Sequence, residues 1–198
     1  MKAMLAKQLR PALVGTVVLC LMTGFIYPGV VTGLAQLLFP RQANGSLVTV
    51  DGVVVGSALI GQGFSRPEYF HPRPSAAGAG YDPTASGGTN KGPTDRKLAD
   101  TLIAESVAGV RTVDGVMGPI PADMVTRSAS GLDPHISPAN AALQVARVAG
   151  ARGVGVDQIR EILARHTEGR QFGFFGEPRV NVLLLNIALD SALGRRGR

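Results

Sequence analysis

The sequence has few residues that form disulfides or bind metal ions, with one cysteine and three histidines among 198 residues. It has no tryptophan. The lone Cys20 excludes an intramolecular disulfide framework and a cysteine-rich zinc site. His71, His135 and His166 stand at no spacing typical of a metal site, so we predict no metal ligands. We therefore expect the stability to come from an ordinary hydrophobic core.

The body of the chain also lacks an excess of basic residues, although the formal net charge is +6. That excess lies at the two ends, in Lys2, Lys7, Arg10, Arg195, Arg196 and Arg198. Without these six, 14 basic residues balance 14 acidic ones. A nucleic-acid interface has to neutralise several phosphates, so we predict no nucleic-acid partner and a short solvated tail at the C-terminus.

Charged residues are absent from residues 11–40. A helix of about 20 apolar residues crosses the hydrocarbon core of a bilayer, whereas a cleavable signal peptide has a shorter apolar region and a small-residue cleavage site, which is missing here. We predict an uncleaved transmembrane helix over residues 12–34, in contact with the lipid bilayer. Pro28-Gly29 should kink or end its straight part.

The charges around this span predict its orientation. Three cations precede it and only Arg41 follows closely. By the positive-inside rule, residues 1–11 are cytoplasmic and residues 35–198 lie outside the cytoplasmic (inner) membrane.

The residues beyond the span predict one α+β domain. Asp51-Gly52 between residues 47–50 and 53–55 favours a β-hairpin with a type I′ turn, whose second strand continues to about residue 62. Helices are expected over residues 94–107, 138–151, from Asp157 to near Gly169, and 181–193, with Thr94 and Ser137 capping the first two. The second should turn Ala142, Val145, Ala146 and Ala149 inward. Short strands are expected at residues 110–116 and 124–128.

Residues 63–93 are rich in Pro, Gly and Ser and show no periodicity. This segment is too long for an ordinary connection between elements. Phe64, Tyr69, Phe70 and Tyr81 argue against disorder. We predict an ordered loop, and two roles for its rings stay open: contact with a partner, or a place in the domain's own core.

Two further segments are chemically suggestive. Ser130, Asp133 and His135 are the residue types of a hydrolytic triad, so a membrane-anchored periplasmic hydrolase is the alternative function. Their close spacing, and the absence of a nucleophile-elbow motif, favour instead a turn at Asp133-Pro134 followed by a capped helix. Residues 174–181 place two adjacent phenylalanines before a Gly-Glu-Pro turn, and two roles stay open: folding over the core, or presenting Phe174, Phe175 and Arg179 to a partner, since aromatic and Arg anchors are typical of interfaces.

Four motifs taken together resemble a known family. They are Gly56-Ser57-x-Leu59-Ile60-Gly61-Gln62, Tyr69-Phe70-His71-Pro72-Arg73-Pro74-Ser75-Ala76, Ser130-Gly131-Leu132-Asp133-Pro134-His135-Ile136-Ser137-Pro138 and Gly176-Glu177-Pro178-Arg179-Val180-Asn181-Val182-Leu183. With the N-terminal span, the set resembles the C subunit of the bacterial high-affinity potassium-transporting P-type ATPase, the Kdp system.

The resemblance implies an accessory subunit, itself non-catalytic, that stabilises a potassium uptake complex and acts as a catalytic chaperone raising the ATP affinity of the ATPase subunit. The implied partners are a channel-like potassium-binding subunit, a P-type ATPase subunit and a small single-helix subunit, and the complex handles ATP, Mg and potassium. We expect the outer domain to cap the extracellular entrance of the potassium subunit. With that domain outside the cytoplasm, any effect on ATP affinity would have to be transmitted through the partners.

The candidate motif and partner-interface residues come from these motifs and from the helix that begins at residue 138. They are Phe70, Arg73, Pro74, Ser75, Gly131, Asp133, Pro134, His135, Ser137, Gln144, Phe174, Phe175, Glu177, Pro178, Arg179 and Asn181. No catalytic residue is assigned.

Overall fold

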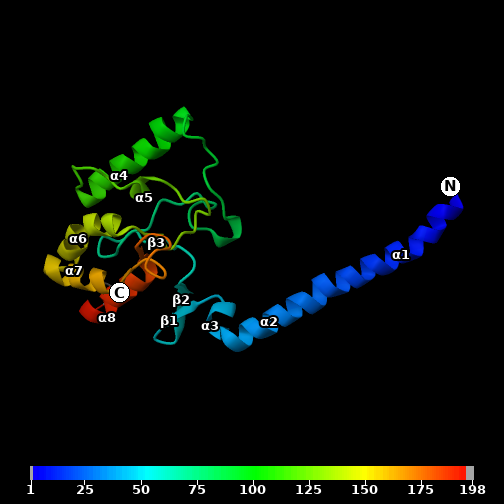
Figure 1. Ribbon diagram of the computed structural model, residues 1–198. Helices are drawn as coiled ribbons and strands as arrows, with labels where there is room; N and C mark the ends of the chain where they lie inside the picture. Colours follow the sequence, from blue (N-terminus) through cyan, green and yellow to red (C-terminus); the bar gives the residue numbers. More distant parts are fainter. Residues whose placement is uncertain (1, 195–198) are drawn as a thin grey trace. The chain divides into compact units, whose positions relative to one another are not determined.

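The computed structural model describes residues 2–194, with side chains from residue 7 onward. The chain forms two compact units, Met1–Leu47 and Val48–Arg198 (Figure 1). The predicted tail of Arg195, Arg196 and Arg198 lies outside the described residues.

The N-terminal unit is helical: α1 (Lys2–Leu21), a π-helical turn η1 (Met22–Ile26), α2 (Tyr27–Leu38) and the short α3 (Pro40–Ala43). Lys7–Leu38 is the one stretch of the described chain that is long and apolar enough to cross a membrane, which agrees with the predicted span. The helix does not end at Pro28. The wide turn at η1 directly precedes the proline, where a helix usually adjusts to the ring and to the missing N–H.

The predicted hairpin is confirmed as β1 (Leu47–Val50) and β2 (Val53–Ser57). Asp51 and Gly52 both have positive φ, 52° and 79°, as a type I′ turn requires. The second strand ends earlier than predicted. Ser57 turns the chain by accepting bonds from Leu59 N and Ile60 N, after which Gly61 N donates to Leu132 O.

The core of the outer unit lies among α6 (Pro138–Arg152), α7 (Val156–Arg165) and α8 (Val182–Leu193), which surround a small antiparallel sheet (Figure 1). The sheet has the order β3-β5-β4, with β3 at His135–Ile136, β5 at Arg179–Asn181 and β4 at Thr167–Glu168. As predicted, Ser137 caps α6, its Oγ accepting from Asn140 N at 3.1 Å. Ala142 and Ala146 are exposed, contrary to prediction, because Ala141, Gln144 and Val148 occupy the inward face instead.

Predicted and observed elements differ most between residues 94 and 128. It contains η3 (Leu98–Ile103), α4 (Ala104–Asp114) and α5 (Ala122–Val125), and the two predicted strands are wrong. Val110 packs with Val116, Met124 and Val125 in a second small core, so these apolar residues serve helical packing. The side-chain cap before η3 comes from Asp95, which accepts from Lys97 N, and not from Thr94.

Candidate functional site

Residues 67–71, which overlap the start of the second motif, form a segment without helix or strand that we call the strap. The Phe70 side chain is fully buried in the main core. Asn186 of α8 bonds both backbone groups of Phe70, at 2.8 and 3.0 Å. Gln144 of α6 does the same for His71, at 2.7 and 3.0 Å. Two side-chain amides thus take the place of a neighbouring strand, and the buried backbone of the strap is satisfied.

Two arginines complete the attachment of the strap. Arg147 Nη1 donates to Pro67 O at 2.6 Å and to Tyr69 O at 2.9 Å, while its Nε bonds Asp114. The buried Arg152 donates to Glu68 O at 2.7 Å and to Asp190 Oδ1 at 2.8 Å. Each guanidinium is therefore both paired with a carboxylate and used to bind backbone carbonyls, as a buried charge requires.

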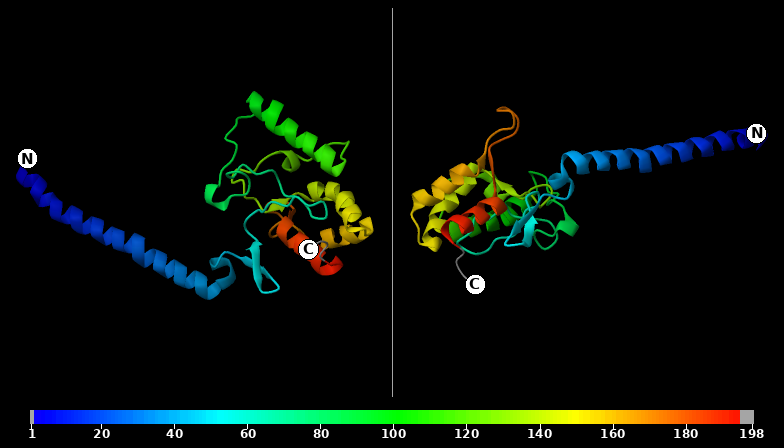
Figure 2. Two further views of the ribbon diagram at one scale, coloured as in Figure 1. Left: turned by 180° about the vertical axis from the view of Figure 1, so that it is seen from behind. Right: turned by 90° about the horizontal axis from the view of Figure 1, so that it is seen from below.

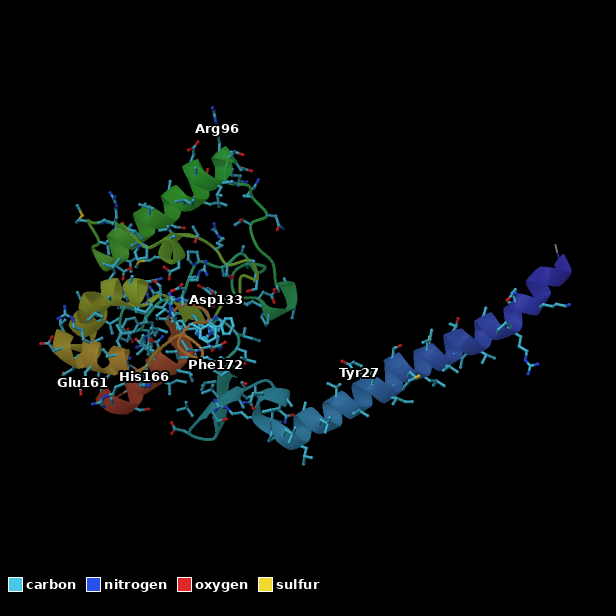
Figure 3. All side chains as sticks on the ribbon, viewed as in Figure 1. Tyr27, Arg96, Asp133, Glu161, His166 and Phe172 are labelled. Carbon is cyan, nitrogen blue, oxygen red and sulfur yellow. The ribbon has the colours of Figure 1, made fainter. Side chains whose placement is uncertain are left out.

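The strap leads directly to Arg73, which lines a groove of about 550 Å³ in the outer unit. Seven of the residues singled out from the motifs line it: Arg73, Asp133, His135, Ser137, Glu177, Pro178 and Arg179. Three parts of the chain distant in sequence thus meet: the segment after the strap, the approach to α6, and β5 with its preceding turn. Figure 3 labels Asp133, which lies in the middle of the outer unit.

Four charged side chains of this groove lie in ion pairs, some with each other and some with residues just outside it. Arg73 Nη1 lies 3.0 Å from Asp133 Oδ2, and Asp133 Oδ1 accepts from His135 N at 3.0 Å. Burial raises the pKa of Asp133, but the bonds from His135 and Arg73 outweigh it and hold the pKa of this carboxyl below its ordinary value. Arg179 pairs with Glu168 at 2.8 Å, and Glu177 with Arg170 at 2.7 Å.

Asp123, which sequence reasoning missed, organises the other side of the groove. It accepts from Ser137 N at 2.8 Å, from Ser137 Oγ at 2.9 Å and from Asn140 Nδ2 at 3.0 Å. Asn140 Oδ1 in turn accepts from Gln144 Nε2 at 2.8 Å. A continuous hydrogen-bond network therefore runs from the groove to the strap.

Ser75 and Gly131 fix the chain behind the groove. Ser75 Oγ donates to Gly131 O at 2.7 Å and accepts from Tyr81 N at 2.8 Å. Burial raises the pKa of Tyr81 to about 12, and its hydroxyl donates to Arg73 O at 2.5 Å. Gly131 has φ +68°, and a Cβ there would lie 2.6 Å from Ala77 N, so the position requires glycine on two counts.

The remaining candidate residues have separate positions. Pro134 O accepts from Val182 N where β3 meets β5, and Pro74 lines a smaller cavity of about 220 Å³ with His71 and Gln144. Asn181 caps α8 and donates to Ala58 O. Phe174 and Phe175 are exposed, on a hairpin away from the core. For Phe70 the core role holds, because its side chain has no exposed surface.

The geometry does not assemble the hydrolytic triad considered above. Ser130 Oγ accepts from Leu132 N and contacts Ser128 Oγ, and His135 Nδ1 lies 3.5 Å from Asp133. Within residues 2–194 no hydrogen bond joins Ser130 to His135, whereas a triad needs its base bonded to its nucleophile. In that same part of the chain, no three His, Cys, Asp or Glu side chains gather as a metal site would require.

The fold and groove define a class: an α+β domain whose polar groove is built from mutually paired side chains, in a chain with one candidate membrane span. The family described as "K+-transporting ATPase, c chain" matches residues 9–191, and the chain belongs to that family. The resemblance stated from the motifs is thereby confirmed.

Similar proteins cover nearly the whole chain. A protein of Gemmatimonas aurantiaca named "Potassium-transporting ATPase KdpC subunit" is 66% identical over 186 residues, covering 93% of each chain. Proteins of the same name from Myxococcus xanthus and Koribacter versatilis are 59% and 54% identical, over 90% and 93% of this chain and 85% and 94% of theirs.

Proposed function

We propose that this chain is a non-catalytic accessory subunit of an ATP-driven, high-affinity potassium uptake complex, in which it stabilises assembly. The observation that carries the proposal is the 66% identity, over 93% of both chains, to a protein named as a subunit of a potassium-transporting ATPase. The groove supports it, because its ion-paired side chains form a polar surface suited to contact with another protein.

The proposed partners are a channel-like potassium-binding subunit, a P-type ATPase subunit and a small single-helix subunit in the inner membrane. The outer domain caps the extracellular entrance of the potassium subunit, and its groove residues form part of that contact. The extracytoplasmic position of the domain is supported by the three cations at the N-terminal end of the candidate span Lys7–Leu38, against Arg41 alone just after it.

In this proposal, ATP and Mg are bound by the ATPase subunit and potassium by the channel-like subunit. The chain raises the ATP affinity of the ATPase subunit through a coupling free energy that passes through the membrane partners. In the proposed orientation only residues 1–11 lie on the nucleotide's side of the membrane, which is why the effect is assigned to coupling and not to direct contact with ATP.

The Arg73–Asp133 pair offers a direct test of the groove. R73D places two carboxylates together and D133R two guanidiniums, whereas R73D/D133R restores opposite charges. In a strain without other potassium uptake, each single variant should slow growth at micromolar potassium, and the double variant should recover part of it. R96D, at the exposed start of the helix leading to α4, is the matched control (Figure 3). Normal growth of both single variants contradicts the role of the groove.

Cysteine labelling tests the orientation. In a C20S background, R96C should react with a membrane-impermeant maleimide in intact spheroplasts, whereas A3C, ahead of the candidate span, should react only after lysis. The reverse pattern contradicts an extracytoplasmic domain.

A further inference from the structure

A small hairpin closed by the Gln171–Phe175 bridge projects from the body of the outer unit (Figure 2). It carries the phenylalanine tip, which we define as Phe172, Phe174 and Phe175. Their side chains are 88%, 64% and 56% exposed. A cluster of three exposed rings on one projecting turn is unusual for a surface that faces only water.

The turn holds Phe172 in a left-handed backbone conformation, which phenylalanine seldom adopts. Phe172 has φ +52° and Gly173 φ +82°, the left-handed region that glycine and asparagine adopt most readily. Phe172 is thus both strained and exposed, a combination that points to a function for the ring itself.

Backbone hydrogen bonds join the two sides of the hairpin. Gln171 N donates to Phe175 O and Phe175 N to Gln171 O, both at 2.9 Å. Below the tip, Arg170 pairs with Glu177 and Arg179 with Glu168. The apolar rings thus stand on a bonded hairpin above two ion pairs, and this pairing lowers the cost of moving the tip out of water.

We propose that the phenylalanine tip inserts into the surface of the lipid bilayer. Only nine residues, 39–47, separate the end of the candidate span from Val48, so the chain cannot carry Val48 further than about 30 Å from that end of the span. This short tether keeps the membrane at high effective concentration. Insertion into hydrocarbon requires no complementary shape, unlike docking to a protein. A turn that carries exposed rings and forms no groove is therefore suited to lipid.

The absence of tryptophan allows a direct test. The full chain carrying F174W is reconstituted into phosphatidylcholine vesicles with or without brominated acyl chains. We expect a blue-shifted emission that loses most of its intensity with brominated lipid. M117W, at a position that is 84% exposed and outside the hairpin, should be neither shifted nor quenched. F172S/F175S in the F174W chain should abolish quenching while near-ultraviolet circular dichroism stays unchanged.

The same F174W measurement on the purified complex separates lipid from protein. Quenching by brominated lipid there too supports insertion. A blue shift without quenching that appears only when the partner subunits are present would show that a protein covers the tip and would overturn the proposal. Unshifted, unquenched F174W emission in both preparations would overturn it as well, and neither result bears on the accessory function.

Discussion

At the scale of single residues, the most consequential side chains are polar ones on the inner faces of helices. Gln144 serves four groups: both backbone groups of His71, Asn140 Oδ1 and Arg147 Nη2. Q144L should lower the free energy of unfolding by about 3 kcal/mol, because several buried partners lose their bonds. Thermal unfolding of the detergent-solubilised chain, followed by near-ultraviolet circular dichroism, measures this.

A142S, on the exposed face of the same helix, is the control for that variant and should stay within about 0.5 kcal/mol of the wild type. Equal stability of Q144L and A142S would contradict the role given to the amide.

His71 should make the outer domain less stable in mild acid. Burial lowers the pKa of His71, and the nearby Arg147 lowers it further. The unfolded chain therefore binds a proton more readily than the folded one. Stability is highest above the ordinary histidine value of about 6.5 and falls as the pH drops from there towards the folded pKa.

H71Q should accordingly flatten the loss of stability between about pH 7 and pH 5, a range above most carboxyl titrations. Urea unfolding at each pH is the measurement, and an unchanged slope in H71Q would show that other groups cause the loss.

Among the residues, the sequence motifs identified most of the groove but not its support. Arg73, Asp133 and Arg179 belong to recognisable motifs and do meet in one groove. Asn186 and Arg152 belong to none of the motifs. Asn186 is a polar residue among the apolar residues Leu185 and Leu189 of one helix, which is a signal that the sequence does offer. The packed strap explains why both polar side chains are buried, because they bind its backbone.

At the scale of elements, the turn at Gly131 joins the groove to residues 75–87. G131A should destabilise the chain by more than about 2 kcal/mol, since its Cβ would meet backbone atoms of Ala77 and Gly87 below 3.0 Å, in addition to the strain of a positive φ.

Gly115 is a matched control, because its φ is +66° but a Cβ there meets open space. G115A should cost only about 1 kcal/mol, from backbone strain. Denaturant unfolding of the two variants separates crowding from strain, and equal losses would contradict the close approach at Gly131.

Elements with local signals were predictable and those set by tertiary packing were not. Ser137-Pro138 predicts the start of α6, and Asp51-Gly52 predicts the turn of the hairpin. Both predictions succeed because helix caps and tight turns depend on bonds between residues close in sequence. Val110, Val113 and Val116 are β-branched, which favours a strand, but Val110 and Val116 pack against Met124 and Val125, and this packing accompanies a helix through Asp114.

At the scale of the whole molecule, the formal charge of +6 is the sum of two charged ends and a neutral body. Within the neutral body, Arg73, Arg147 and Arg152 are each paired with a carboxylate, and no basic excess is left for a polyanion, which suits contact with protein and lipid better.

The accessory function is tested most directly by purifying the complex through a tag on the ATPase subunit, from cells that express all partner subunits with or without this chain. With the chain, the channel-like subunit should co-purify and ATP hydrolysis should respond to potassium. Without it, we predict loss of the channel-like subunit from the preparation and loss of that response. Equal recovery of the channel-like subunit, with unchanged potassium-dependent hydrolysis, would contradict the account.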